Sequence, residues 1–368
     1  MVIGVLREGK DENRVVLLPE HVSSLVKKSI EVWVEKDAGK AAYASDADYK
    51  SEGAVIKSRA DILKGSDVLF SINTPEDNIP KGKVLISILS PLSNQTVVEK
   101  FAKGGVTTYS LDMIPRTTRA QAVDVLSSMA TVAGYKAVLL AASQLPHFFP
   151  MFMSASGTIK PSKILILGAG VAGLQALATA RKLGAVVEVF DVRSAVKEEV
   201  MSLGGKFVEV EGAVDDASAG GYAVEQSEDY KKKQGELIHE RALQSNVIIT
   251  TAQIPGKQAP LLIHKETVEG MKAGSVIIDL AAATGGNCEL TKNNETTVQH
   301  DVTIIGNSNL PSTMPFDASK MLGRNYLNFF ELMIDDEGKL NLDVEDDIVQ
   351  HTCITRNGEV VNERVKGK

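Results

Sequence analysis

Three glycines with G-x-G-x-x-G spacing form the pattern that most directly indicates chemistry in this chain. Gly168, Gly170 and Gly173 follow an apolar run of strand type at residues 163–167 and open a stretch with helical periodicity. In this context the first glycine allows a tight turn and the second lets the backbone approach a pyrophosphate. The third lets the helix lie close to the sheet. The pattern predicts a dinucleotide site, whose phosphates would face the N–H groups at the helix start. A purely structural glycine turn is the alternative.

An acidic residue ends the next strand-type run. Asp191 lies 191 − 173 = 18 positions after Gly173, close to the ~20 expected for the carboxylate that binds the adenosine ribose. It would accept hydrogen bonds from the ribose hydroxyls and repel a 2′-phosphate, which favours NAD over NADP. Arg193 is a contrary signal, because an arginine near this point can hold that phosphate; we give the carboxylate more weight.

Strand-like and helix-like segments alternate around these residues. The first 125 residues contain apolar runs of strand length, and after the fingerprint further runs complete a Rossmann pattern. A long apolar, alanine-rich stretch at 120–145 would be a linker helix between two domains. The tail at 340–361 contains an Asn-Gly turn signal at Asn357 and Gly358, which predicts a hairpin or extended tail packed on the first domain. The strand-like runs are 30–35, 67–72, 83–89, 105–110, 247–250, 275–279 and 302–305.

We therefore expect an α/β protein with two Rossmann-like domains. Both would have parallel sheets, long linker helices would join them, and NAD would lie in the cleft. The expected N-terminal domain is discontinuous, with residues 1–126 plus 314–368, and the NAD-binding domain has residues 127–313. One polar stretch, residues 211–234, interrupts this pattern and contains Gly221 and Tyr222. It is either a lid over the nucleotide or a mobile surface insertion, and composition does not separate the two.

Composition limits the class of protein. The 368 residues suffice for two domains, and 43% hydrophobic residues with a mean hydropathy of −0.02 describe a soluble globular chain. A net charge of −7 argues against nucleic acid as a partner. The two cysteines indicate no disulfide framework and favour a reducing compartment. We expect no bound metal, no signal peptide and no spanning helix, because no apolar run approaches ~18 residues.

The chain lacks other obvious catalytic motifs. It has one fingerprint and no nucleophile elbow, P-loop or metal cluster. Oxidation of an alcohol or amine needs a base beside the nicotinamide, whereas hydride transfer between two nicotinamides needs only that the rings be held together without water. A single dinucleotide site without an evident base fits the second case, provided that another protein brings the other nucleotide.

The sequence resembles the NAD(H)-binding component of proton-translocating NAD(P) transhydrogenase and, more distantly, alanine dehydrogenase. The resemblance covers essentially the whole chain, and the segment at 116–128 is the most diagnostic one. The segments that carry it are 12–15, 115–128, 133–135, 168–173, 191–193, 204–207, 254–257, 274–280 and 285–288.

Departures from alanine dehydrogenase separate the two branches. The substrate lysine of that enzyme aligns with Asn73, its histidine acid/base with Ser90, and its aspartate near nicotinamide with Ala283. Only its arginine is kept, as Arg14. Loss of the proton-handling side chains is expected if only hydride moves. An alanine dehydrogenase-like amino-acid oxidoreductase and a non-catalytic NAD sensor remain as alternative functions.

The resemblance implies roles for individual residues. Arg116 and Asp124 would hold the nicotinamide carboxamide with help from Ser127, and Gln121 would point towards the NADP of the partner. An ion pair between Arg116 and Asp124 that stabilises a turn is the competing interpretation. Tyr222 would close over the nucleotide, and Gln253 stands where relatives have an aliphatic residue. The cofactor-binding residues implied are Arg116, Gln121, Asp124, Ser127, Gly168, Gly170, Val171, Ala172, Gly173, Asp191, Val192, Arg193, Gly221, Tyr222, Gln234 and Gln253, of which Gln121, Arg116 and Asp124 would serve catalysis.

The resemblance also implies partners. The chain would form a homodimer and lie on the inner, cytoplasmic face of a membrane through membrane-embedded subunits, including a beta subunit that binds NADP(H). We expect a separate peripheral subunit, because the chain stops at Lys368 without membrane helices. The apolar stretch at 148–153 could serve the dimer contact, although ordinary core between the domains is the favoured interpretation.

Overall fold

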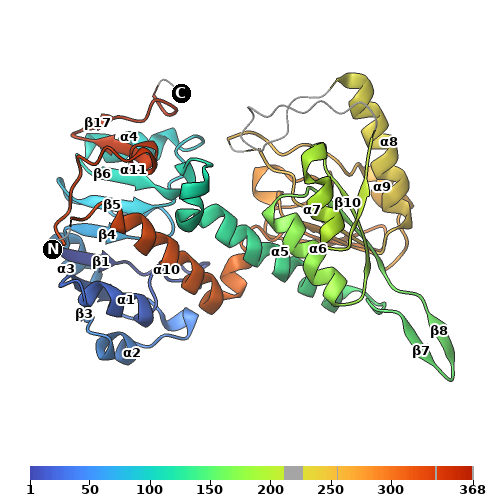
Figure 1. The fold of residues 1–368 in the computed structure, drawn as a ribbon, viewed down its shortest axis with the longest axis horizontal. Helices are drawn as coiled ribbons and strands as arrows, with labels where there is room; N and C mark the ends of the chain where they lie inside the picture. Colours follow the sequence, from blue (N-terminus) through green and yellow to red (C-terminus); the bar gives the residue numbers. More distant parts are fainter. Residues whose placement is uncertain (211–226, 255, 336–337, 367–368) are drawn as a thin grey trace. The chain divides into compact units, whose positions relative to one another are not determined.

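The computed structural model describes residues 1–210, 227–254, 256–335 and 338–366, and it divides into two compact units. Unit 1 comprises Met1–Met129 with Pro311–Lys368, and unit 2 comprises Ala130–Leu310 (Figure 1). Gly221 and Tyr222 lie outside the described residues. The α/β class with mostly parallel sheets is confirmed in both units.

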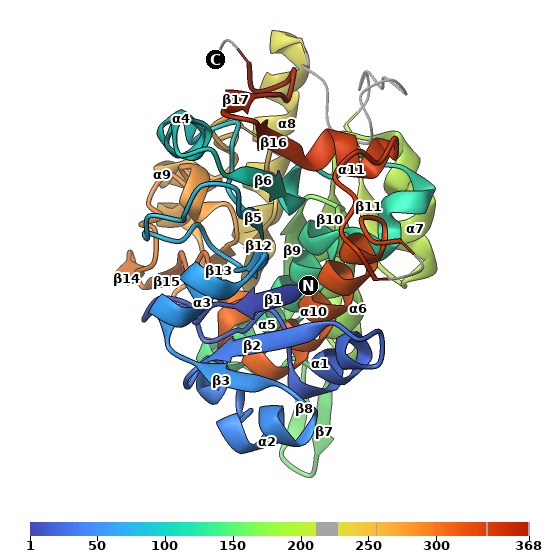
Figure 2. The ribbon, with the colours of Figure 1, turned by 90° about the vertical axis from the view of Figure 1, so that its left-hand side faces the viewer.

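The sheet of unit 1 has eight strands in the order β17-β16-β6-β5-β4-β1-β2-β3, which can be followed in Figure 2. Six of them are parallel, and the C-terminal strand β16 pairs antiparallel with β6 and with β17. The strands are β1 (Val2–Val5), β2 (Glu31–Glu35), β3 (Val55–Lys57), β4 (Val68–Phe70), β5 (Val84–Ser87), β6 (Thr107–Ser110), β16 (Cys353–Arg356) and β17 (Glu359–Val360).

Helices cover both faces of this sheet. The larger core lies under α1 and α10, where Tyr326 and Phe330 contact Phe70 with ring centroids 5.6 and 5.5 Å apart. The smaller core lies under α3 and α4 on the other face. The elements are α1 (Pro19–Val26), α2 (Asp46–Ser51), α3 (Arg59–Gly65), α4 (Gln95–Lys103), α10 (Pro315–Glu331) and α11 (Asp347–Thr352), with 3₁₀ turns η1 (Lys40–Ala42), η2 (Leu111–Met113) and η3 (Thr118–Val123).

The expected turn in the tail is present. Asn357 and Gly358 join β16 to β17 with φ angles of +54° and +88°, the left-handed conformation that a tight hairpin turn requires. Helix α11 occupies some of the stretch that the sequence suggested was extended. Its start is stabilised by Asp346, whose Oδ1 accepts hydrogen bonds from the N–H groups of Ile348 and Val349.

The sheet of unit 2 has seven strands in the order β11-β10-β9-β12-β13-β15-β14, all parallel except β14. The order reverses between β9 and β12, as in a Rossmann fold, and ligands bind at such a switch point. The three strands predicted after the fingerprint are confirmed. The strands are β9 (Lys163–Leu167), β10 (Val186–Phe190), β11 (Lys206–Val208), β12 (Val247–Thr250), β13 (Val276–Asp279), β14 (Thr296–Gln299) and β15 (Val302–Ile305).

One core of unit 2 lies between this sheet and α5, α6 and α7, and a second lies under α8 and α9 on the other face. Gln234 lies in α8, so the expectation of an irregular segment up to residue 234 is wrong for its last residues. Ser227 caps that helix by accepting from the N–H of Tyr230. The helices are α5 (Val125–Gln144), α6 (Val171–Lys182), α7 (Lys197–Ser202), α8 (Glu228–Gln244) and α9 (Lys265–Gly270).

Helix α5 differs from expectation in two respects. It begins at Val125 rather than near Ala120, because Asp124 caps it through the N–H and hydroxyl of Ser127. Its 20 residues also make it, within the described ranges, the one helix long and apolar enough to cross a membrane by length and composition. The expectation that no stretch has this character is therefore wrong, since interspersed Ala, Gly, Ser and Thr hid it from a search for unbroken apolar runs. The core helix of a soluble protein can have the same length and composition.

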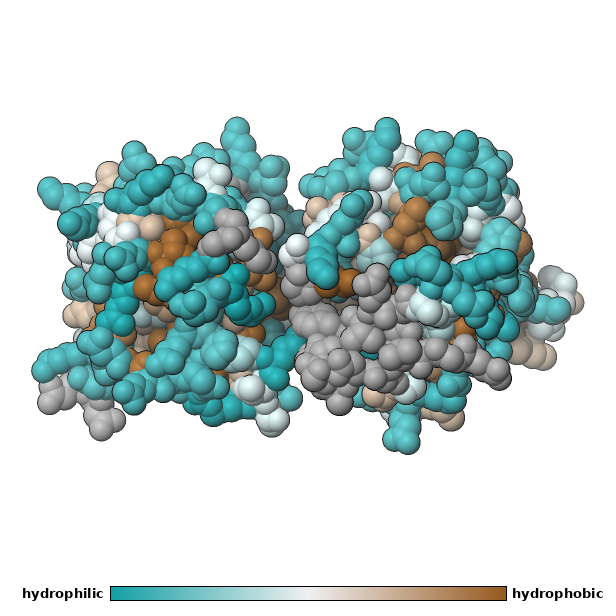
Figure 3. Space-filling view, turned by 90° about the horizontal axis from the view of Figure 1, so that it is seen from above, coloured by the Kyte–Doolittle hydropathy of each residue, from teal (hydrophilic) through white to brown (hydrophobic). Residues whose placement is uncertain are grey.

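A two-stranded hairpin, β7 (Phe152–Ser154) and β8 (Gly157–Ile159), extends away from the rest of unit 2 (Figure 1). Phe148, Met151, Phe152 and Met153 are exposed around it, Met153 to 74%, whereas Phe149 is buried. The interpretation of residues 148–153 as ordinary core is therefore wrong. Elsewhere the surface seen in Figure 3 is mainly hydrophilic, with small apolar patches on each unit.

A buried histidine should make the stability of unit 1 depend on pH. His21 in α1 accepts a hydrogen bond from the N–H of Leu18 on Nδ1, and burial lowers its pKa from 6.5 to about 4. Below pH 6.5 the unfolded chain binds a proton that the folded chain refuses. The stabilisation is therefore complete above pH 6.5 and is lost as the pH falls towards 4, with about 2 kcal/mol lost at pH 5.

This pH dependence can be measured by urea unfolding at pH 7 and pH 5, followed through Trp33 in β2, the single tryptophan of the chain. His21→Gln should lose about 2 kcal/mol less than the wild type between the two pH values. His351→Gln, which removes an exposed histidine of α11, should keep the wild-type difference. Equal slopes for His21→Gln and the wild type would contradict the assignment.

Candidate dinucleotide-binding site

The fingerprint turn joins β9 to α6 at the switch point of the unit 2 sheet. Gly168 has a φ of +107°, and a Cβ there would lie 2.4 Å from Oγ1 of Thr251. A Cβ on Gly173 would lie 1.9 Å from the carbonyl oxygen of Gly168. These two glycines are therefore required by the turn and by the close approach of helix and strand.

Gly170 is different, because nothing in the described residues explains it. It is the N-cap residue of α6 with φ −77° and ψ −173°, an extended conformation open to any residue. A Cβ there would meet no described atom within 4 Å. Neither backbone conformation nor packing demands a glycine, which points to a ligand in this space. The helix start at Val171 and Ala172 supplies backbone N–H groups beside it.

Asp191 follows β10 and lies next to this turn. Its Oδ2 accepts hydrogen bonds from the N–H of Ala169 at 2.7 Å and from Nη2 of Arg193 at 2.7 Å. Its Oδ1 accepts from the N–H and Nε of Arg193, both at 2.9 Å. The carboxylate is buried and its four acceptor positions are occupied, three of them by Arg193. The structure thus joins the fingerprint, Asp191 and Arg193 in one network, with Val192 between the last two.

Other residues at the carboxyl edge of the sheet were not singled out from the sequence. Asp279, fully buried at the end of β13, accepts from Thr250, Thr291 and three backbone N–H groups and so holds the following loop. Asn287 in that loop donates to the carbonyl groups of Ala252 and Pro260. An acid that ends a buried apolar run was the available signal for Asp279.

Gly134 of α5 is a further residue that the sequence offered only as a family marker. A Cβ there would lie 2.1 Å from the carbonyl oxygen of Ala172, so this glycine lets α5 pack against the first turn of α6. Gln253 follows β12 and is exposed, and its Nε2 donates to the carbonyl of Leu280 at 2.7 Å. Its amide therefore belongs to the same edge of the sheet.

The remaining implied site residues lie in unit 1. Arg116 and Gln121 are exposed on the loop around η3, while Ala120 and Val123 of that loop are buried in the core. Asp124 and Ser127 are joined by the cap of α5, with the Ser127 hydroxyl 2.6 Å from Oδ2 of Asp124. The loop therefore presents long polar side chains from an anchored backbone.

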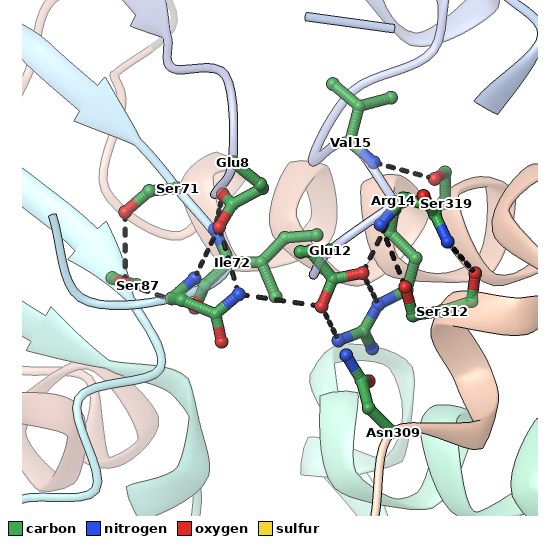
Figure 4. Close-up of polar contacts among 12 residues, drawn as sticks. Glu8, Glu12, Arg14, Val15, Ser71, Ile72, Ser87, Asn309, Ser312 and Ser319 are labelled. Atoms are coloured by element: carbon green, nitrogen blue, oxygen red, sulfur yellow. Dashed lines mark hydrogen bonds and ion pairs between the residues drawn. The ribbon is translucent and has the colours of Figure 1, made fainter. Parts of the chain in front are cut away.

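A second polar cluster lies at the carboxyl edge of the unit 1 sheet, where Figure 4 shows Glu12 and Arg14 side by side. Both are buried, and Nε of Arg14 donates to Oε1 of Glu12 at 2.7 Å. Asn73 donates through Nδ2 to Glu8 at 3.0 Å and to Glu12 at 3.5 Å. Burial raises the pKa of the Glu8 carboxyl above its usual range. Arg14 therefore faces a carboxylate of its own chain.

The fold and the fingerprint define an α/β protein of the dinucleotide-binding class. Residues 4–133 match the family description "Alanine dehydrogenase/PNT, N-terminal domain", and residues 137–363 match "Alanine dehydrogenase/PNT, C-terminal domain". The first portion of NAD(P) transhydrogenase subunit alpha of Rhodospirillum rubrum, a separate chain, is 43% identical over 100% of both chains. The crystal structure of transhydrogenase from Sinorhizobium meliloti superposes with a TM-score of 0.86 at 36% identity over 99% of both chains. Alanine dehydrogenase of Mycolicibacterium smegmatis is 25% identical over 99% of this chain and 96% of its own.

The chain therefore belongs to the alanine dehydrogenase/PNT family, on the branch of the NAD(P) transhydrogenase alpha subunits. The resemblance inferred from sequence motifs is confirmed.

Proposed function

We propose that the chain is the NAD(H)-binding subunit of a proton-translocating NAD(P) transhydrogenase of the Re/Si-specific type. The observation that carries the proposal is the combination of an open space at Gly170 with the loss of proton-handling side chains. Asn73 and Ser90 stand where alanine dehydrogenase has its lysine and histidine, and Ala283 stands in place of its aspartate. The nucleotide site is kept, while the groups that amino-acid oxidation needs are gone.

Bound NADH would supply a hydride that leaves with both bonding electrons for NADP⁺ on the partner, so the protein neither gives nor takes a proton in this step. The protein residues bind, orient and exclude water. Gly170, Val171 and Ala172 line the space for the pyrophosphate. Arg116, Asp124 and Ser127 orient the carboxamide of the nicotinamide, and Gln121 lies towards the second nucleotide.

Asp191 favours NAD(H) on this chain and leaves NADP(H) to the partner. A ribose hydroxyl that binds this carboxylate takes an acceptor position now held by the Arg193 side chain. A 2′-phosphate there would place two anionic groups in contact. The pair formed with Asp191 also occupies the guanidinium that could otherwise hold such a phosphate.

Partner subunits follow from this role. We propose that the chain lies at the cytoplasmic face of the membrane, bound to membrane-embedded subunits that include the NADP-binding beta subunit. We also propose that it forms a homodimer through the β7–β8 hairpin. A two-stranded hairpin is marginally stable alone, and this one carries exposed apolar side chains that a second copy would cover.

The double substitution Phe152→Asp/Met153→Asp is expected to convert the dimer to a monomer, because it places two charges in the apolar contact. Sedimentation velocity would detect the change from 2 × 39.4 = 78.8 kDa to 39.4 kDa. Val298→Asp, at another exposed apolar residue of unit 2, is the matched control and should stay dimeric. A dimer that survives the hairpin change would place the contact elsewhere.

The function is tested with membranes that contain the partner subunits but are stripped of this one. NADH-driven reduction of an NADP⁺ analogue should appear when the chain is added. Intact NADH binding without transfer, on membranes proven competent with another alpha subunit, would contradict the proposal. NAD-dependent deamination of alanine by the isolated chain would then favour the dehydrogenase alternative, and its absence would favour an NAD sensor.

A further inference from the structure

The loop that carries Arg116 and Gln121 is attached to the C-terminal segment of unit 1. The carbonyl oxygen of Ala122, near the end of η3, accepts hydrogen bonds from Nδ2 of Asn325 and Nδ2 of Asn328, both at 2.9 Å. A short 3₁₀-helix has few and poorly aligned internal hydrogen bonds, so contacts from outside can decide its position.

The two amides stand on a rigid base. Asn325 and Asn328 belong to α10, whose neighbouring side chains Tyr326, Phe329 and Phe330 are fully buried in the main core of unit 1. The hydroxyl of Tyr326 also donates to the carbonyl oxygen of Ser71 at 2.7 Å, which ties the helix to the end of β4. A donor on this helix cannot move without disturbing the core.

Arg119 makes a second attachment, to the start of α11. Its Nη1 lies 2.6 Å from Oδ2 of Asp346, and its Nη2 donates to Oδ1 of Asp347. Asp346 uses its other oxygen, Oδ1, to cap α11. The hydrogen bond from Arg119 lowers the pKa of Asp346, so this carboxyl stays ionised at neutral pH. One guanidinium therefore engages two adjacent carboxylates on an ordered helix start, a geometry that defines direction as well as distance.

The placement of these contacts matters more than their contribution to folding. Arg119 is exposed, and exposed ion pairs add little to stability. Yet Arg119 and Ala122 flank Gln121, so the two attachments fix the backbone on both sides of the residue proposed to face the second nucleotide. Hydride transfer depends steeply on how the reacting rings are placed.

We propose that Arg119, Asn325 and Asn328 are positioning residues for hydride transfer. They hold Gln121 from behind, through the C-terminal helices, without touching either nucleotide. The inference rests on the proposed function and adds residues to it that the fingerprint and the loop motif do not contain.

The test uses Arg119→Gln and Asn328→Ala in the full chain, assembled with partner membranes. Each variant should lower the single-turnover rate of hydride transfer about five- to tenfold, and the double variant should lower it further. The dissociation constant for NADH should change less than twofold. Hydrogen–deuterium exchange of the peptide that spans residues 116–124 should rise in the same variants without any nucleotide present. Arg119→Lys, which keeps the charge but has a single ammonium, should fall between Arg119→Gln and the wild type.

Lys28→Gln is the matched control. It removes an exposed ion pair of 2.6 Å to Glu331, which also joins the N- and C-terminal segments of unit 1, and it should change neither the rate nor the exchange. Unchanged rate and exchange in Arg119→Gln and Asn328→Ala would overturn the inference. An equal loss of NADH affinity and rate would also overturn it, because the residues would then contact the nucleotide. Absence of transfer by the wild type would instead contradict the proposed function.

Discussion

Replacing Gly170 by valine is expected to weaken NADH binding at least about a hundredfold, or about 2.7 kcal/mol, while the protein stays folded. The backbone of Gly170 is extended, a conformation that valine adopts readily, and no described protein atom lies within 4 Å of its would-be Cβ. The added side chain would fill the space proposed for the pyrophosphate. Fluorescence titration with NADH gives the affinity, and the thermal midpoint of the ligand-free protein should move by less than about 2 °C.

Two other glycine variants separate binding from folding. Gly9→Val changes an exposed glycine of unit 1 that also has no described neighbour within 4 Å of a Cβ, and it should leave both properties unchanged. Gly173→Ala should instead destabilise the fold, because its Cβ would overlap the carbonyl oxygen of Gly168 at 1.9 Å. NADH binding by Gly170→Val with wild-type affinity would remove the main support for the site.

Arg116→Ala and Gln121→Asn should slow hydride transfer to the partner about a hundredfold, since misplacement of about 1 Å can cost that much. The affinity for NADH should fall no more than about threefold, because the fingerprint supplies the phosphate contacts. Both side chains are exposed on an anchored loop, so their truncation leaves no cavity. Single-turnover kinetics at saturating NADH, beside direct binding measurements, separate the two effects.

Arg364→Ala, at an exposed arginine of unit 1 outside this loop, is the control and should transfer hydride at the wild-type rate. Equal losses of rate and affinity in Arg116→Ala would argue that this side chain only binds the nucleotide. A rate that does not change would exclude both residues from the positioning of the rings.

Much of the fold could be predicted because its signals are local. The strand before Gly168, the helix after it and the parallel strands at 247–250, 275–279 and 302–305 are short apolar runs bounded by turns. The hairpin turn at Asn357 and Gly358 is likewise a property of two adjacent residues. Such signals survive because neighbours in sequence decide them.

What could not be predicted depends on contacts between distant residues. Composition did not show that residues 148–153 leave the core, since an apolar run has the same pattern on a hairpin as inside a domain. The start of α5 is set by the side chain of Asp124 and not by hydrophobic periodicity. The network around Asp279 joins residues 250–291, and the full occupation of Asp191 by Arg193 is a matter of rotamer. The roles of Arg116, Gln121, Asp124 and Ser127 came from family resemblance and stay predictions.

The C-terminal origin of β16 and α10 determines the order in which the chain can fold during synthesis. Unit 2 is a continuous segment, whereas unit 1 is complete only when residues 311–368 have left the ribosome. Until then the edge of β6 has no β16 beside it, and the sheet face that packs on Tyr326 and Phe330 stays uncovered. The half that is translated first therefore matures last, and the nascent N-terminal half carries an open strand edge and apolar surface of the kind that chaperones bind.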